Sequence, residues 1–113
     1  MKSYTNLEQS QKLAEILSAK SADAFYDMAE SEKRQVPIIG DPDDYYDMED
    51  WTIPCWSLAS LLDILPEGTR LLKSETGDTY HCDCPKGNIN KWYDNPVDVC
   101  VELILKLHES NLL

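Results

Sequence analysis

The segment from Asn95 to Leu113 constrains the fold more than any other part of this sequence, because it is patterned as one long amphipathic helix. Asn95 suits the N-cap, and Pro96 suits the first helical position, where a backbone N–H has no helical partner anyway. A stripe of apolar residues follows at helical spacing: Val97, Cys100, Val101, Ile104 and Leu107. Leu103 and Leu105 widen this surface, so we expect a helix buried on more than one side and central to the core.

Two further helices are expected earlier in the chain. The first begins near Asn6, where two capping boxes are open to it, Thr5 with Glu8 or Asn6 with Gln9. The second covers residues 53–66 (IPCWSLASLLDILP), with leucines at helical spacing and a proline at each end. We expect Trp56 to pack beneath this second helix.

Five short segments have the composition of strands. They cover residues 22–28, 35–39, 70–74, 78–82 and 88–93. Pro37 restricts the second to a sheet edge, and turn signals divide the last three into an antiparallel meander.

The expected fold is therefore a single α+β domain over residues 1–113. It consists of a small antiparallel sheet of about five strands packed with three helices. The expected order along the chain is helix, two strands, helix, three strands, helix (αββαβββα).

Charge is unevenly distributed along the chain. The net charge is −11, and no Lys or Arg occurs between Arg34 and Arg70. Such a field repels phosphates and anionic membranes, and it favours protein partners with a basic surface. We therefore expect no direct nucleic-acid binding and no membrane span, since the apolar runs are also too short for one.

The compartment is inferred from the N-terminal residues and the cysteines. The sequence MKSYTNLEQSQKLAEIL has no basic region followed by an apolar one, so we expect no signal peptide. The four cysteines are then better explained as reduced thiols than as a disulfide framework. These observations predict a cytoplasmic protein.

An acidic segment at residues 41–51 (DPDDYYDMEDW) is the first candidate site. It fails as a calcium-binding EF-hand loop, because a loop starting at Asp41 would place tyrosines at positions 5 and 6 and a threonine at position 12. A solvated connection is the simplest interpretation, and weak binding of a divalent cation by an irregular carboxylate cluster stays open. A further interpretation is a face that binds another protein, formed by Asp43, Asp44, Tyr45, Tyr46, Asp47 and Trp51. The alternative is a mimic of nucleic-acid phosphates that blocks a DNA-processing enzyme.

The run His81-Cys82-Asp83-Cys84 is the second candidate site. On a strand, Cys82 and Cys84 would share one face while His81 and Asp83 share the other. Two thiolates could begin a structural zinc site with His81 as a further candidate ligand, but tetrahedral coordination needs four ligands. Burial as small apolar residues is the commoner role of free cysteines.

No motif for a nucleophilic serine, a phosphate-binding loop, a zinc protease or a dinucleotide site occurs in the sequence. We therefore expect no cofactor and no catalytic residues, and the sequence favours a non-catalytic protein-binding or adaptor module.

Two segments carry a resemblance, residues 53–66 (IPCWSLASLLDILP) and residues 95–113 (NPVDVCVELILKLHESNLL). They resemble small uncharacterised proteins of gut bacteria and their phages, as do residues 12–27 (KLAEILSAKSADAFYD). The resemblance implies a cytoplasmic protein associated with phages or mobile elements, and it implies no activity, cofactor or site residue.

The acidic segment leads to a first prediction. Replacing Asp43, Asp44 and Asp47 by Asn and Tyr46 by Ala should abolish capture of the native partner and shift the thermal midpoint by only a few degrees. Affinity capture compared with a melting curve measures both effects. Capture that persists would remove the site from this segment, and competition with DNA that fades as salt rises would identify a nucleic-acid mimic instead.

Overall fold

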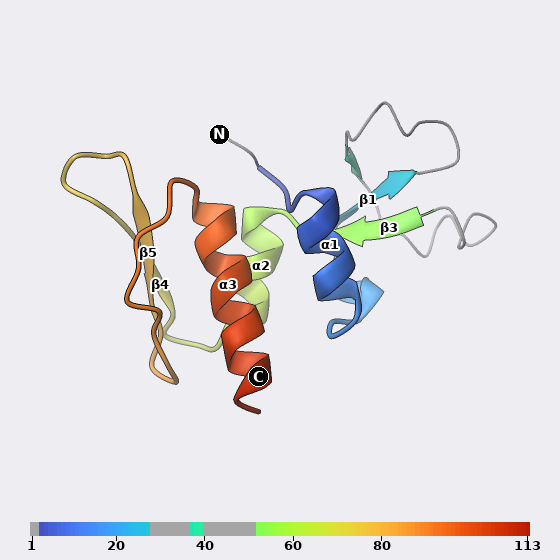
Figure 1. Cartoon of the computed structure of the whole chain (residues 1–113). Coiled ribbons are helices and arrows are strands. Elements are labelled where there is room, and N and C mark those ends of the chain that lie inside the picture. The colour runs from blue at the N-terminus through green and yellow to red at the C-terminus, as the bar shows by residue number, and fades with distance from the viewer. Residues whose placement is uncertain (1–2, 28–36, 40–51) are drawn as a thin grey trace.

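The computed structural model describes residues 3–27, 37–39 and 52–113, and it confirms the expected α+β class. The helices are α1 (Leu7–Ala14), α2 (Leu58–Ile64) and α3 (Pro96–Glu109), with a 3-10 turn at Ala19–Ser21. The strands are β1 (Ala24–Asp27), β2 (Ile38–Ile39), β3 (Thr52–Cys55), β4 (Arg70–Lys73) and β5 (Tyr80–Asp83). In Figure 1, α3 and α2 stand between the β4–β5 hairpin on one side and α1 with the other strands on the opposite side.

The described strands form two antiparallel sheets rather than the single sheet that was expected. One sheet has the order β2-β1-β3, and the other is the β4–β5 hairpin. The order along the described chain is helix, three strands, helix, two strands, helix. The expected order αββαβββα is therefore wrong, because it has two strands before the second helix and three after it.

The helix α3 is central to the main core, as the apolar pattern predicts. Its buried residues surround most of the helix: Pro96, Val97, Val99, Cys100, Val101, Leu103, Ile104 and Leu107. It packs against β5, α2 and α1. Burying each large apolar side chain stabilises the fold by about 1.5–3 kcal/mol, so this helix contributes a large share of the driving force for folding.

Both ends of α3 have local signals that stop the helix. The Asn95 side chain accepts a hydrogen bond from the Val97 N–H at 2.8 Å, which fixes the start. At the other end Asn111 adopts a left-handed conformation (φ 59°). The N–H groups of Asn111 and Leu112 donate to the carbonyls of His108 and Leu107 at 3.0 and 2.8 Å, which is the Schellman arrangement.

The start of α1 decides between the two capping boxes. The Gln9 N–H donates to the Asn6 side chain at 2.8 Å, and the Asn6 N–H donates to the Gln9 side chain at 3.0 Å. The Asn6–Gln9 box is therefore the one that forms. Thr5 is buried instead, and its hydroxyl contacts the Ser10 hydroxyl at 2.7 Å and accepts from the Trp56 N–H at 3.1 Å.

The predicted helix over residues 53–66 is wrong in its first part. Residues Thr52–Cys55 form β3, with Pro54 paired opposite Phe25 in β1, and the helix α2 starts only after Ser57. The strand β3 is at the edge of its sheet, where a proline, which has no N–H to donate to the ladder, is tolerated. Asp23 fixes the change of direction, since its carboxylate accepts hydrogen bonds from both the N–H and the hydroxyl of Ser57. Pairing with β1 thus overrides the helical pattern.

The prediction of a third strand in the meander, at residues 88–93, is also wrong. Only Tyr93 pairs with the hairpin, through two backbone hydrogen bonds with Tyr80 at 2.7 and 2.9 Å. Residues 88–92 have no regular secondary structure, and their hydrogen bonds are local: the Lys91 N–H donates to the Ile89 carbonyl, and the Asn88 side chain accepts from the Cys84 N–H.

The other strands agree with the sequence. The strands β4 and β5 form the predicted hairpin, β1 lies within residues 22–28, and β2 is an edge strand directly after Pro37. Trp56 is fully buried in the same core cluster as Leu61 of α2, as expected. No helix among residues 3–27, 37–39 and 52–113 is both long enough and apolar enough to cross a membrane.

The central position of α3 leads to a second prediction. Leu103→Ala should lower the free energy of unfolding by about 3 kcal/mol, because it leaves a cavity among side chains that are fully buried. Leu113→Ala is the matched control, since Leu113 is 41% exposed, and it should change stability by less than about 0.5 kcal/mol. Urea denaturation measures both, and equal effects would contradict the central role of α3.

Candidate functional site

The outer face of the β4–β5 hairpin is the candidate site among the described residues. Leu71 and Cys82 pair across the hairpin, and their buried or partly buried side chains contribute to the main core. Because side chains alternate along a strand, the neighbouring pairs point away from the core. These pairs are Leu72 with His81 and Arg70 with Asp83. We call these four residues, together with Trp92, the hairpin outer face.

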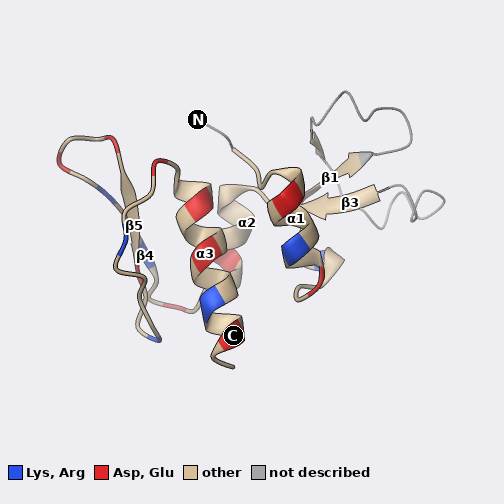
Figure 2. Ribbon diagram, viewed as in Figure 1, with Lys and Arg blue, Asp and Glu red and all other residues tan. Residues whose placement is uncertain are grey.

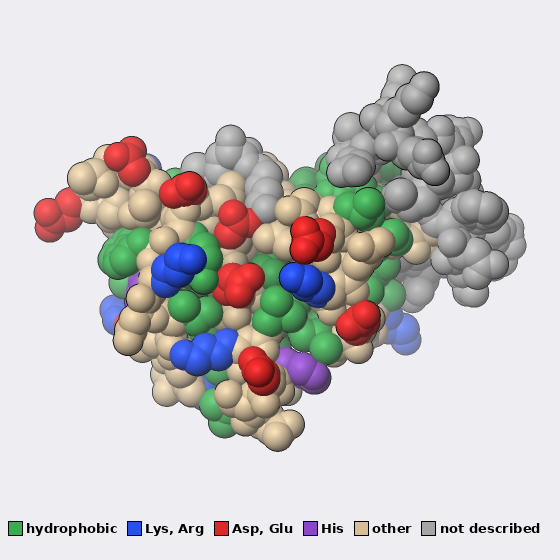
Figure 3. Space-filling model, in the orientation of Figure 1, with side chains coloured by type: hydrophobic (Ala, Val, Ile, Leu, Met, Phe, Trp, Pro, Cys, Tyr) green, Lys and Arg blue, Asp and Glu red, His purple; other side chains and the backbone are tan. Residues whose placement is uncertain are grey.

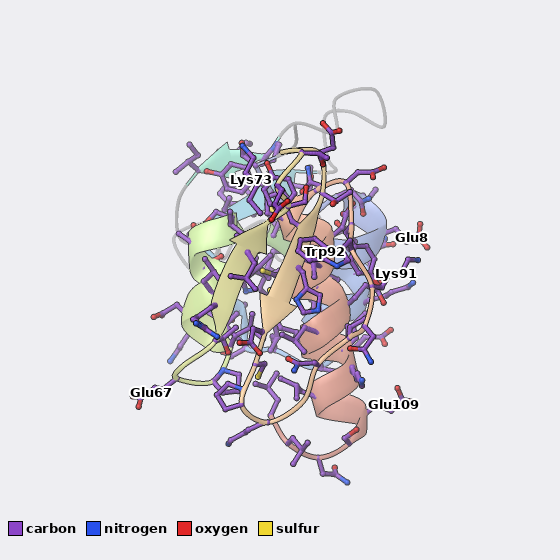
Figure 4. All side chains as sticks on the ribbon, turned by 90° about the vertical axis from the view of Figure 1, so that its left-hand side faces the viewer. Glu8, Glu67, Lys73, Lys91, Trp92 and Glu109 are labelled. Atoms are coloured by element: carbon purple, nitrogen blue, oxygen red, sulfur yellow. The ribbon has the colours of Figure 1, made fainter. Side chains whose placement is uncertain are left out.

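Trp92 is the most prominent member of the hairpin outer face. It is 47% exposed, and its ring centroid lies 5.2 Å from that of His81 with a tilt of 33°. Leu72, opposite His81 on β4, is 39% exposed. Figure 4 views the molecule from this side and shows Trp92 beside the hairpin, with Lys91 next to it in the chain. Leu72 and His81 lie opposite each other on paired strands, and Trp92 packs on His81, so these three side chains form a small, mainly apolar surface.

An ion pair borders this apolar surface. Arg70 donates a hydrogen bond to the Asp83 carboxylate across the hairpin. The hydrogen bond from Arg70 lowers the pKa of Asp83 below its usual range, with smaller contributions from the charge of Arg70 and from Asn88. Both side chains are solvent-exposed, so the ion pair adds little to the stability of the fold, and it forms the polar border of this surface.

The hairpin region differs in charge from the rest of this acidic chain. Residues 67–93 contain four basic residues (Arg70, Lys73, Lys86 and Lys91) and four acidic ones (Glu67, Glu75, Asp78 and Asp83). Their charges cancel, whereas the whole chain carries −11. Figure 2 shows the basic residues along the hairpin and acidic ones at its tip. The hairpin outer face therefore lacks the strong negative field that the sequence as a whole implies.

The structure places the zinc candidates on opposite sides of β5. His81 contacts Trp92 on the outer side, while Cys82 and Cys84 are buried, as alternation along a strand predicts. The sulfur of Cys82 lies 3.8 Å from that of Cys100 in α3. Within the described part of the chain, no group of three or more His, Cys, Asp or Glu side chains could hold a metal ion.

The acidic candidate site lies outside the described residues. This applies to all six residues predicted to bind a partner, Asp43, Asp44, Tyr45, Tyr46, Asp47 and Trp51. Their role stays a prediction. In the described part, acidic and basic side chains are interspersed over α1 and α3, as Figure 3 shows, with no large field of one sign on that face.

A shallow hollow of about 340 Å³ lies at the start of α1, lined by Asn6, Leu7, Glu8 and Gln11. The side chain of Asn6 already caps the helix there. Because the Asn6 side chain is already engaged in capping, we assign the hollow no ligand.

Sequence reasoning missed the hairpin outer face, because it assigned Trp92 to a strand and concentrated on the aromatics near the acids. The signal was present in the alternation of residues 70–73 and 80–83, where Leu72 and His81 fall on the polar side. A leucine and a histidine on the side of the hairpin that should face water indicate a surface that contacts something else.

Comparison of the chain with protein-family models, with curated proteins and with solved structures found no match. The resemblance to proteins of gut bacteria and phages therefore stays a prediction.

The ion pair leads to a third prediction. Arg70→Ala should raise the pKa of Asp83 toward its ordinary value, because the main cause of the depression is removed. A depressed carboxyl pKa favours folding above the unfolded value and loses that contribution as pH falls through the folded value, so the variant should also show a slightly weaker acid dependence of stability. Carboxyl NMR titration measures the shift. Lys86→Ala is the control and should leave the Asp83 titration unchanged.

Proposed function

We propose that this protein is a non-catalytic binding module for another protein, and that the hairpin outer face contacts the partner. The observation that carries the proposal is Trp92, a large aromatic side chain that is 47% exposed and yet held against His81. Tryptophan and arginine are enriched among the residues that dominate binding energy at protein interfaces. Both occur on this face.

The composition of the face supports a protein partner. Leu72 and Trp92 supply apolar area, His81 supplies a ring between them, and the Arg70–Asp83 pair forms a polar border. An apolar centre with a polar rim is the usual anatomy of a protein interface. The balanced charge of residues 67–93 removes the repulsion that other parts of the chain would impose on an acidic partner.

A rigid backbone supports the same proposal. The hairpin is paired along its whole length, and Tyr93, the residue after Trp92, is fixed to Tyr80 by two backbone hydrogen bonds. Side chains held in this way lose little further conformational entropy when a partner binds.

The cytoplasm is the proposed location. The four cysteines are free and buried, which supports a reducing compartment. The acidic segment at residues 41–51 is a separate proposal for a contact with a basic partner, and it is tested by its own substitutions.

The fourth prediction tests the hairpin outer face. A partner enriched by affinity capture is purified, and its affinity is measured by calorimetry against the wild type, Trp92→Ala and Leu113→Ala. Trp92→Ala should weaken binding at least about tenfold, because loss of a central aromatic contact typically costs more than about 1.4 kcal/mol. Leu113→Ala removes a similarly exposed apolar side chain from the C-terminal end and should change the affinity less than about twofold.

An affinity that Trp92→Ala leaves unchanged would place the contact elsewhere. If the substitutions in the acidic segment abolish binding while Trp92→Ala does not, the site is at residues 41–51. Circular dichroism of each variant confirms that binding is compared between folded proteins.

A further inference from the structure

Two cysteines that the proposed binding role does not use lie in contact inside the core. Cys82 in β5 and Cys100 in α3 have sulfur atoms 3.8 Å apart and are 2% and 0% exposed. The backbone brings them together, because Cys82 is on the inner side of the hairpin and β5 packs on α3. They are separated by 18 positions in the sequence.

The two thiols form a hydrogen bond with each other. The hydrogen bond with the Cys100 thiol lowers the pKa of Cys82, whereas that hydrogen bond and burial raise the pKa of Cys100. The directions of these two pKa shifts favour Cys82 as the thiol that loses its proton first. Two thiols in contact can form an intramolecular disulfide once one of them is oxidised, because the second thiol then attacks the oxidised sulfur.

The other two cysteines lack this combination of features. Cys55 lies in the smaller cluster under β1 and β3, and burial with the nearby charge of Asp23 raises the pKa of its thiol to about 12. Cys84 is buried two positions after Cys82 and is 3% exposed. It is therefore a matched comparison, being the same residue type with the same degree of burial.

We propose that Cys82 and Cys100 form a redox-active dithiol, which a hydroperoxide oxidises to an intramolecular disulfide joining β5 to α3. This inference is independent of the proposed binding function. A disulfide requires the sulfurs to approach from 3.8 Å to about 2.0 Å.

The chemistry balances with one equivalent of hydroperoxide. The Cys82 thiolate attacks the terminal oxygen, the O–O bond breaks, and the leaving oxygen takes up the proton that Cys82 released. The Cys100 sulfur then attacks the sulfur of the resulting sulfenic acid, the S–O bond breaks, and the oxygen leaves as water with the Cys100 proton. The two thiols lose two electrons and two protons in total, and the hydroperoxide is reduced.

Access of the oxidant depends on local opening of the hairpin. The strand β4 is paired on one side only, and β5 gains one further pair, at Tyr93. Short edge elements of this kind open more readily than a central helix. A small oxidant such as hydrogen peroxide is therefore the suitable probe.

The fifth prediction is tested first on the wild-type chain. The native protein is treated with hydrogen peroxide, the remaining thiols are alkylated in denaturant, and the protein is cleaved on the amino side of aspartate. Cleavage before Asp83 separates Cys82 from Cys84, so the bridged peptides identify the cysteines directly. We expect a mass loss of about 2 Da before alkylation and a single linked pair, Cys82 with Cys100.

Variants provide the second measurement. Cys84→Ala should form the disulfide at the wild-type rate, whereas Cys100→Ala should not form it and should instead leave a sulfenic acid at Cys82 that dimedone traps. Dithiothreitol should restore all four thiols in the wild type. Four alkylatable thiols after peroxide treatment of the wild type, or a bridge that includes Cys84, would overturn the proposal. Because the wild-type peptide map stands alone, the test holds even if Cys100→Ala does not fold.

Discussion

Burial of α3 is the interaction on which the other elements depend. Its apolar side chains extend around most of the helix, so no single neighbour can cover them. The hairpin covers one side through β5, while α2 and α1 cover the others. Each of these elements is short, and the hairpin would be marginal alone in water. Packing on α3 is therefore what stabilises them.

The three-stranded sheet is attached to this core by buried polar contacts. The Tyr26 hydroxyl donates to the Thr5 carbonyl at 2.7 Å, and the Thr5 N–H donates to the Trp56 carbonyl at 2.9 Å. The Trp56 ring N–H in turn donates to the Ser21 hydroxyl at 3.0 Å. Because buried polar groups are costly when unpaired, such contacts fix the register of the segments that they join.

The strand β5 takes part in both of the features for which we propose a role. Its outer side carries His81 against Trp92, and its inner side carries Cys82 against Cys100. A covalent link on the inner side would restrict the motion of the same backbone that presents the outer side.

The sequence by itself determined the elements whose signals are local. The capped and striped helix α3, the hairpin at residues 70–83, the edge position after Pro37 and the burial of Trp56 all follow from spacing, capping and turn residues. The tertiary structure decided the rest. Residues 53–55, which belong to a helical pattern, pair with β1 instead, residues 88–92 have no regular secondary structure, and Trp92 packs on His81. These outcomes depend on partners distant in the chain, and the periodicity of a segment carries no information about which partner it meets.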